Sequence, residues 1–137
     1  MLPLRTHVGR RRGSADERGQ AIVEFALVLP ILALLLFGII QFGLVFNNYV
    51  TLTDAVRAGA RKAAVSRQSG DPVGATQTAV KNAASDLDLS KLTINVTSSW
   101  NPTEDVVVKG CYPYTIDLMG VVFKSGSMCS TTTERVE

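Results

Sequence analysis

The first pattern along the chain is a long apolar run near its beginning. From Phe25 to Thr53, 29 consecutive residues include no charged side chain. A membrane-spanning helix needs about 20 predominantly apolar residues at a rise of about 1.5 Å each. The run therefore predicts a transmembrane helix over residues 20–46. It is too long for a secretory signal peptide, and no closely following A-x-A-like site marks cleavage behind it.

Beyond residue 46 the apolar positions change to an amphipathic pattern. Small or apolar residues recur at spacings of three and four, which is typical of a helix with one buried face. We expect the membrane helix to continue as an amphipathic extension over residues 47–68. The whole rod, about 48 residues, would be roughly 70 Å long.

The extension carries small side chains at Ala55, Gly59, Ala60 and Ala63. Small residues let two helices approach closely, and this helix-packing face has two interpretations. It packs against its own domain, or it contacts the helix of a neighbouring subunit. The sequence leaves both open.

Residues 69–137 predict a small α+β domain. Asp71 is a plausible N-cap with Pro72 at the first helical position, so a second helix is expected from there to about Asp86. We expect its apolar side to consist of Val73, Ala79, Val80, Ala83 and Ala84.

Alternating or β-branched segments then predict about three antiparallel strands. These are Leu92–Thr97, Val106–Tyr112 and Ser127–Thr133. Pro113 is expected to limit the second strand, because proline cannot donate to the ladder. Tyr114–Phe123 is expected to be a connection that covers the sheet or touches the membrane surface.

Cys111 and Cys129 are the only two cysteines, so one pairing exists. Outside the cytoplasm they would oxidise, and a disulfide closing a loop of about 18 residues is worth on the order of 3 kcal/mol. A metal site would need more ligands, and the single histidine, His7, is expected across the membrane. We therefore predict a disulfide and no metal.

Composition and charge sharpen this picture. The chain is 46% hydrophobic and 19% charged, against about 25% charged in average soluble domains. A simple soluble domain is excluded, and the lack of a second long apolar run excludes a polytopic transporter. Residues 1–19 contain five arginines against Asp16 and Glu17, whereas residues 20–137 contain nine basic and ten acidic groups. This asymmetry predicts a basic cytoplasmic leader at 1–19 and an extracytoplasmic domain at 69–137.

Enzymatic and nucleic-acid-binding functions find little support in the sequence. The outer domain has no histidine, and no Gly-rich phosphate loop, metal cluster or Ser–Lys dyad stands out. The basic patch Arg10–Arg12 is short and has no interleaved aromatics. We expect no catalysis, no cofactor, no small-molecule substrate and no nucleic-acid partner.

The start of the apolar helix reads Arg18-Gly19-Gln20-Ala21-Ile22-Val23-Glu24-Phe25. It resembles the processing site of type IV-like prepilins, in which a glycine precedes four residues, a glutamate and an aromatic residue. The resemblance implies that a prepilin peptidase cuts between Gly19 and Gln20 on the cytoplasmic side. It also implies that Glu24, then the fifth residue, pairs with a neighbouring subunit.

A longer match, RGQAIVEFALVLPILALLLFGIIQFGLVF followed by LTDAVRAGARKAAV, is similar to the TadE-like family of tight-adherence (Flp) pilus assembly. One departure is Gln20, where phenylalanine is usual at the new N-terminus, so cleavage stays open. The resemblance implies a minor pilin-like protein, or pseudopilin, of a pilus or secretion system in the cytoplasmic (inner) membrane. Its partners would be the membrane, other pilin or pilus-assembly subunits and the peptidase. The alternative is a static single-pass anchor that presents its outer domain to a secretion machine.

Overall fold

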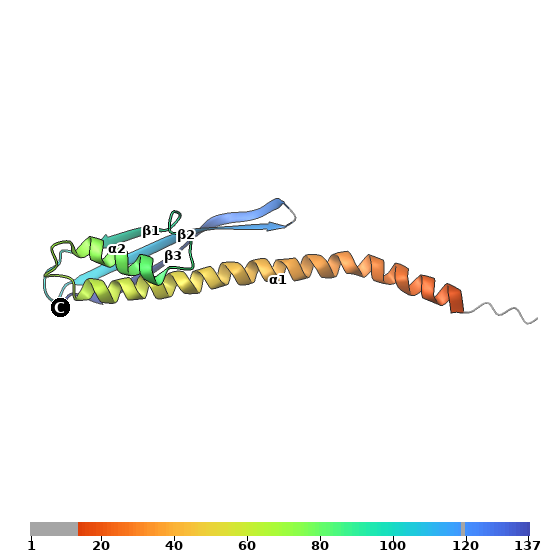
Figure 1. The fold of residues 1–137 in the computed structure, drawn as a ribbon, viewed down its shortest axis with the longest axis horizontal. Coiled ribbons are helices and arrows are strands. Elements are labelled where there is room, and N and C mark those ends of the chain that lie inside the picture. The colour runs from red at the N-terminus through yellow and green to blue at the C-terminus, as the bar shows by residue number, and fades with distance from the viewer. Residues whose placement is uncertain (1–13, 119) are drawn as a thin grey trace, which may run out of the picture. The chain divides into compact units, whose positions relative to one another are not determined.

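The computed structural model describes residues 14–118 and 120–137 of the chain (Figure 1). Most of the basic leader, including Arg5, Arg10–Arg12 and His7, lies outside the described residues. The elements run in the order α1 (Ser14–Ala64), α2 (Pro72–Ala83), β1 (Thr93–Thr97), β2 (Asp105–Leu118) and β3 (Val121–Arg135). The expected α+β class, with one long apolar helix, a short helix and a three-stranded antiparallel sheet, is confirmed.

The chain divides into two compact units, one ending at Phe37 and the other covering Gly38–Glu137. In the first unit α1 is apolar on all sides, and every side chain from Ala21 to Leu32 is exposed. Pro30 lies inside the helix and removes one backbone donor there. Among the described residues, one helical stretch, Gly19–Ala64, is long and apolar enough to cross a membrane, with a mean hydropathy of 2.7 in its most apolar window. This indicates a single-pass membrane protein.

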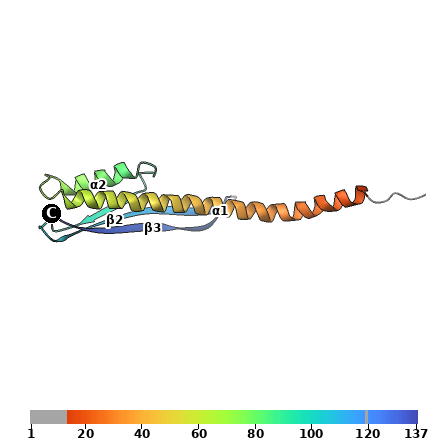
Figure 2. The same cartoon turned by 90° about the horizontal axis from the view of Figure 1, so that it is seen from below.

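The second unit has a hydrophobic core between the end of α1, α2 and the sheet (Figure 2). Leu52 and Val56 of α1 are fully buried, and both lie against Gly110 of β2. Gly59, one turn beyond Val56, lies against Val80 of α2. The helical spacing of these positions puts them on one face, so the amphipathic pattern beyond residue 46 does mark the core-facing side of α1. The helix ends at Ala64, four residues before the expected end at residue 68.

Helix α2 begins as its sequence indicates. Asp71 is the N-cap, and its Oδ1 accepts a hydrogen bond of 2.8 Å from the backbone N–H of Gly74, with Pro72 at the first helical position. The buried side was predicted only in part. Val80 and Ala84 are buried, but Val73 and Ala83 are exposed, and the residue that completes the buried stripe is Thr76.

A polar residue can be buried in this stripe without a large cost in free energy, because its hydroxyl makes a hydrogen bond within its own helix. The Thr76 Oγ1 donates to the carbonyl oxygen of Pro72 at 2.8 Å, which leaves its methyl group for the core. The helix ends at Ala83, and turns rather than helix lead from there to Asp86.

The sheet has the order β1-β2-β3 with antiparallel neighbours. Thr93 pairs with Cys111 at one end of β1, and Asp105 pairs with Arg135 at the open end of the β2–β3 hairpin. Alternate residues of β2 are buried, namely Val106, Val108, Gly110 and Tyr112. One face of the sheet therefore covers the core, and the opposite face is open to solvent.

The prediction that Pro113 limits the second strand is wrong. β2 continues through Pro113 to Leu118, and Pro113 pairs with Ser127 of β3. The pairing of β1 with β2 reaches only Cys111, so beyond that point β2 has a strand neighbour on one side only. A proline is tolerated where a strand has such a free edge.

The expectation that Tyr114–Phe123 is a connection between strands is therefore wrong as well, whereas its contact with the membrane surface is not tested by the pairing. The described residues of this segment belong to the outer part of a long hairpin, and the third strand begins at Val121 rather than near Ser127. The hairpin turns at Gly120, whose φ of +87° favours glycine.

Candidate functional site

The residues of the expected processing site lie in the first turns of the described part of α1. A Cβ built on Gly19 would meet no heavy atom within 4 Å, so packing does not require glycine there. The Nε2 of Gln20 donates to Oε1 of Glu24 at 3.3 Å, and both side chains are exposed. The structure thus places Gln20 and Glu24 one turn apart on the same side of the helix, with the Glu24 carboxylate open to a further partner.

The small-residue face of α1 lies within its own domain. Ala55, Ala60 and Ala63 have no exposed surface, and Gly59 is buried against Val80. A Cβ at Gly59 would lie 2.2 Å from Cγ2 of Val80, so the two helices approach as closely as a glycine allows. Of the two interpretations of this face, the geometry matches packing against the chain's own domain.

The two cysteines come together on neighbouring strands. Cys111 of β2 and Cys129 of β3 are register partners with their Cα atoms 4.1 Å apart, and their sulfurs lie at disulfide distance. The pair lies where β1 pairing ends, because Cys111 is also the partner of Thr93. A bond here links β2 to β3 where β1 no longer supports β2.

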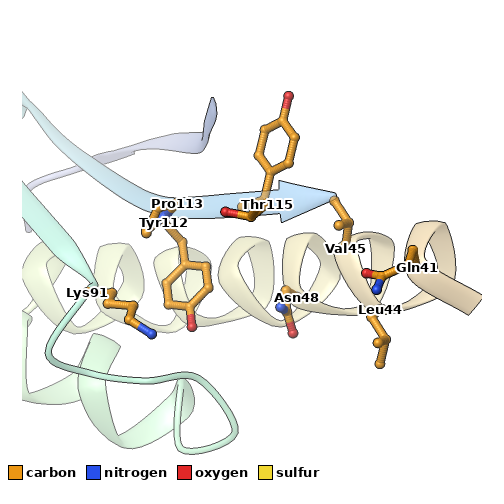
Figure 3. Close-up of a pocket in the computed structure, with 9 residues that line it drawn as sticks. Gln41, Leu44, Val45, Asn48, Lys91, Tyr112, Pro113 and Thr115 are labelled. Atoms are coloured by element: carbon orange, nitrogen blue, oxygen red, sulfur yellow. The ribbon is translucent and has the colours of Figure 1, made fainter. Parts of the chain in front are cut away.

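A groove of about 470 Å³ lies between α1 and the outer half of β2 (Figure 3). From the helix it is lined by Gln41, Leu44, Val45 and Asn48; from the sheet and the loop before it, by Lys91, Tyr112, Pro113, Tyr114 and Thr115. Gln41 and Asn48 are seven residues apart, so their amides lie on one side of the helix, and both are half-buried. The groove therefore gathers the polar side of a mostly apolar stretch of α1.

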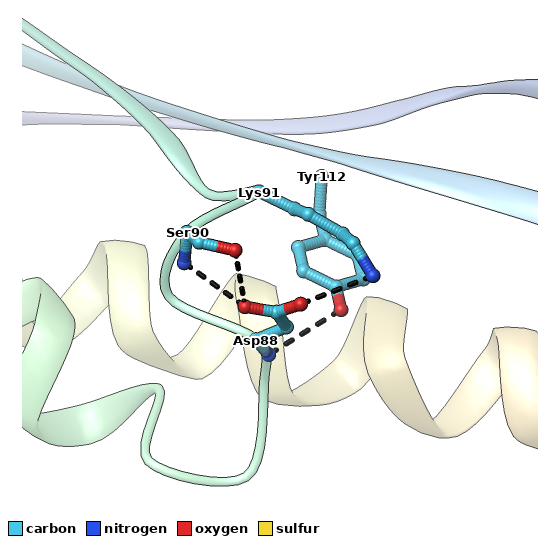
Figure 4. Close-up of polar contacts among 4 residues, drawn as sticks. All are labelled: Asp88, Ser90, Lys91 and Tyr112. Atoms are coloured by element: carbon cyan, nitrogen blue, oxygen red, sulfur yellow. Dashed lines mark hydrogen bonds and ion pairs between the residues drawn. The ribbon is translucent and has the colours of Figure 1, made fainter.

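One polar cluster organises the loop that enters β1 (Figure 4). The Ser90 hydroxyl donates to Oδ1 of Asp88 at 2.6 Å, and Nζ of Lys91 lies 3.0 Å from Oδ2. The hydrogen bond from Ser90 and the contact with Lys91 lower the pKa of Asp88 to about 2. The same ion pair raises the pKa of Lys91. The Asp88 backbone N–H also donates to the hydroxyl of Tyr112 at 3.3 Å, which ties the loop to β2.

Neither this cluster nor the groove was predicted from the sequence. Asp88-x-Ser90-Lys91 is a local signal for a side-chain-capped turn, but Tyr112 is brought to it only by the pairing of distant strands. No group of three or more metal-binding side chains occurs within residues 14–118 and 120–137.

Comparisons with known proteins bear on α1 alone. A search of curated proteins and a search of solved structures give no match to the chain. The family model described as TadE-like protein does match, over residues 19–61, which is the stretch from the glycine of the expected processing site to the core-facing part of α1. The resemblance to the TadE-like family predicted from the sequence is thus confirmed over residues 19–61.

Proposed function

We propose that the protein is a minor pilin-like subunit, a pseudopilin, of a tight-adherence or type IV-like pilus or secretion system. It would lie in the cytoplasmic membrane with its N-terminus inside and its α+β domain outside. The observation that carries this proposal is the TadE-like match beginning at Gly19, on a helix whose apolar side chains are exposed on all sides up to Phe37. Its role would be structural, through packing of α1 with neighbouring subunits.

The structure narrows which part of α1 is available for that packing. The small-residue face around Gly59 is covered by the chain's own α2 and sheet. The exposed apolar surface lies earlier, and Ile22, Phe25 and Leu27 each expose 65% or more of their area. Intersubunit contacts would therefore use the membrane part of the helix.

Glu24 is the group expected to order such contacts. Cleavage after Gly19 would create a cationic amine on Gln20, about one turn from Glu24. Within one chain that contact is exposed and weak. Between chains in a helix bundle it would be desolvated, and an unpaired carboxylate there would be costly.

Support for a non-catalytic role comes from composition. The single histidine is His7, and the outer domain carries no histidine. The competing function is a static single-pass anchor, which the following experiment distinguishes from a pseudopilin.

The test compares Gly19→Leu, Glu24→Gln and the unchanged protein in cells that assemble the pilus. The length of the mature chain is read by mass spectrometry, and assembly by surface piliation. We expect the unchanged protein to lose residues 1–19, Gly19→Leu to keep them, and Glu24→Gln to enter the membrane normally but to reduce piliation. Because no atom lies within 4 Å of a Cβ at Gly19, loss of processing would report on the peptidase rather than on folding.

Gly38→Leu is the matched control, since Gly38 is another helical glycine with free space around a Cβ. It should be processed normally. A mature chain that keeps residues 1–19, together with normal piliation by Glu24→Gln, would reject the pseudopilin and favour the static anchor.

A further inference from the structure

The end of the β2–β3 hairpin is unusually apolar for an exposed loop. Val121, Val122 and Phe123, here called the hairpin tip, are 62%, 60% and 68% exposed. Exposure is not confined to these three residues: β3 is exposed at every position from Val121 to Ser127, so both faces of the outer hairpin are free of the core. Nothing in the chain's own core covers them.

The register of the hairpin is irregular close to its tip. Ile116 pairs with Lys124, but the next residue, Asp117, pairs with Val122, so Phe123 is an extra residue in β3. This shift is a β-bulge, which bends the strand locally.

The position of the hairpin relates the tip to the apolar part of α1 within the same unit. β2 runs antiparallel to the helix, since Gly110 lies against Val56 and Leu52 while Thr115 lines the same groove as Gln41 and Leu44 (Figure 3). Beyond Thr115 the strand continues in the same direction toward the tip. The helix at this level exposes large apolar side chains, namely Ile39, Ile40, Phe42 and Phe46, each at least half exposed.

The two exposed apolar surfaces have a common explanation. If α1 enters a bilayer through residues 38–46, the groove is at the level of the lipid–water interface, and the hairpin reaches the same depth or deeper. Gln41 is half-buried and lines the groove. Tyr49, three residues beyond Phe46, is 43% exposed, and tyrosine is a residue type that is common in the aromatic belt at a membrane surface.

We propose that the hairpin tip inserts into the lipid headgroup region and upper acyl region beside α1, as a second membrane contact of the outer domain. The ligand is the phospholipid bilayer itself, and the proposal rests on the membrane anchoring described under the proposed function. The exposed charges Asp117 and Lys124 flank the tip and favour the headgroup level, where Lys124 would meet lipid phosphates. Free strand edges set the limit of depth, because unpaired backbone groups cannot enter the hydrocarbon core without large cost.

The test uses the full chain reconstituted in phosphatidylcholine vesicles, with one tryptophan as reporter. Trp100 is the only native tryptophan, so Trp100→Phe provides a silent background. Phe123→Trp then reports on the hairpin tip, and Val122→Trp provides a second reporter in case the first folds poorly. We expect blue-shifted emission and strong quenching by lipids brominated near the headgroup, with weaker quenching by lipids brominated near the acyl ends.

Two matched sites separate the possible outcomes. Thr131→Trp, on an exposed residue of the same strand far from the tip, should be unquenched; Phe42→Trp in α1 should be quenched. Quenching at Phe42 without quenching at the tip would overturn the lipid contact and leave the anchor intact. Absence of quenching at both sites would overturn the anchor as well. A tip that is shielded from aqueous iodide but unquenched by brominated lipid would assign it to a protein contact, and this too would overturn the proposal.

Discussion

At the scale of single residues, two glycines set the distance between the layers of the outer domain. A Cβ at Gly110 would lie 2.6 Å from Cγ2 of Val56, and one at Gly59 would lie 2.2 Å from Cγ2 of Val80. Valine has a stiff side chain, so it cannot move aside easily. The contact of α1 with the sheet and its contact with α2 each depend on the absence of one methyl group.

The first prediction is that Gly59→Val destabilises the outer domain. Added carbon at this position overpacks a tight core, for which about 1–3 kcal/mol is typical. Unfolding in detergent can be followed through the single tryptophan, Trp100, which packs against the core. Gly43→Val is the control, because a Cβ at Gly43 meets nothing within 4 Å. Equal melting temperatures for the two variants would contradict the close approach of α1 and α2.

The second prediction concerns the titration of Asp88. Its pKa is lowered from 3.8 to about 2, chiefly by the Ser90 hydroxyl. A lowered pKa in the folded state means that folding favours the ionised form. The resulting stabilisation is fully present above pH 3.8 and is lost as the pH falls through about 2.

Carboxyl-carbon NMR titration of the folded protein measures this value directly. Ser90→Ala should raise the pKa of Asp88 toward 3.8, because it removes the main cause of the shift. Ser85→Ala is the control, since the Ser85 hydroxyl bonds to Asp86 rather than to Asp88. An Asp88 that titrates near 3.8 in the unchanged protein would show that the cluster does not form in solution.

At the scale of elements, the long hairpin is the part that local patterns describe least well. Periodicity predicted α1, the start of α2 and all three strands, because caps, helical spacing and alternation are local signals. It ended β2 too early, since Pro113 is compatible with a strand that β1 no longer flanks. It also missed Thr76, whose hydroxyl is satisfied within its own helix and leaves a methyl for the core.

The candidate site divides in the same way. Gly19, Gln20 and Glu24 could be named from the sequence because the segment resembles a prepilin processing site, and their role stays a prediction. The groove and the contact of Asp88 with Tyr112 could not, because they arise from the pairing of segments 24 or more residues apart. Contacts of this kind depend on the tertiary fold and cannot be predicted from local sequence patterns.

The third prediction is that Cys111 and Cys129 are bonded and that the bond stabilises the hairpin. Alkylation without reductant should label neither thiol, whereas reduction in denaturant should expose both. Replacing both by serine should lower the free energy of unfolding by about 2–5 kcal/mol, as for native disulfides of small domains. Native thiols that alkylate readily would contradict the pairing and would indicate a reducing compartment.

At the scale of the whole molecule, the chain has two different parts. The beginning of α1 exposes its apolar side chains, whereas the outer domain buries its own in a core. Side chains are exposed throughout Ala21–Leu32, whereas the fully buried ones begin at Leu52. Charge follows the same division, with five arginines before Gly19 and nearly balanced charge after it. The exposed apolar helix agrees with one crossing of a membrane, and the charge asymmetry predicts that the N-terminus lies on the cytoplasmic side.

The fourth prediction follows for topology. In spheroplasts, added protease should remove an epitope tag at residue 137 and spare a tag at residue 1. Detergent should make both tags sensitive, which controls for intrinsic resistance. A tag at residue 137 that survives in intact spheroplasts would contradict the single crossing in this orientation.

The last two residues, Val136 and Glu137, contact the core and the end of α1. Val136 is 1% exposed in the core, and the backbone N–H of Glu137 donates to the carbonyl of Ala64 at the end of α1. A ribosome makes α1 long before it makes β3. During synthesis the core-facing side of α1, including Leu52 and Val56, is therefore uncovered at least until β2 has been made, because Gly110 of β2 is the residue against which both side chains lie. A chain interrupted within β3 would lack Val136, which is fully buried in the completed core.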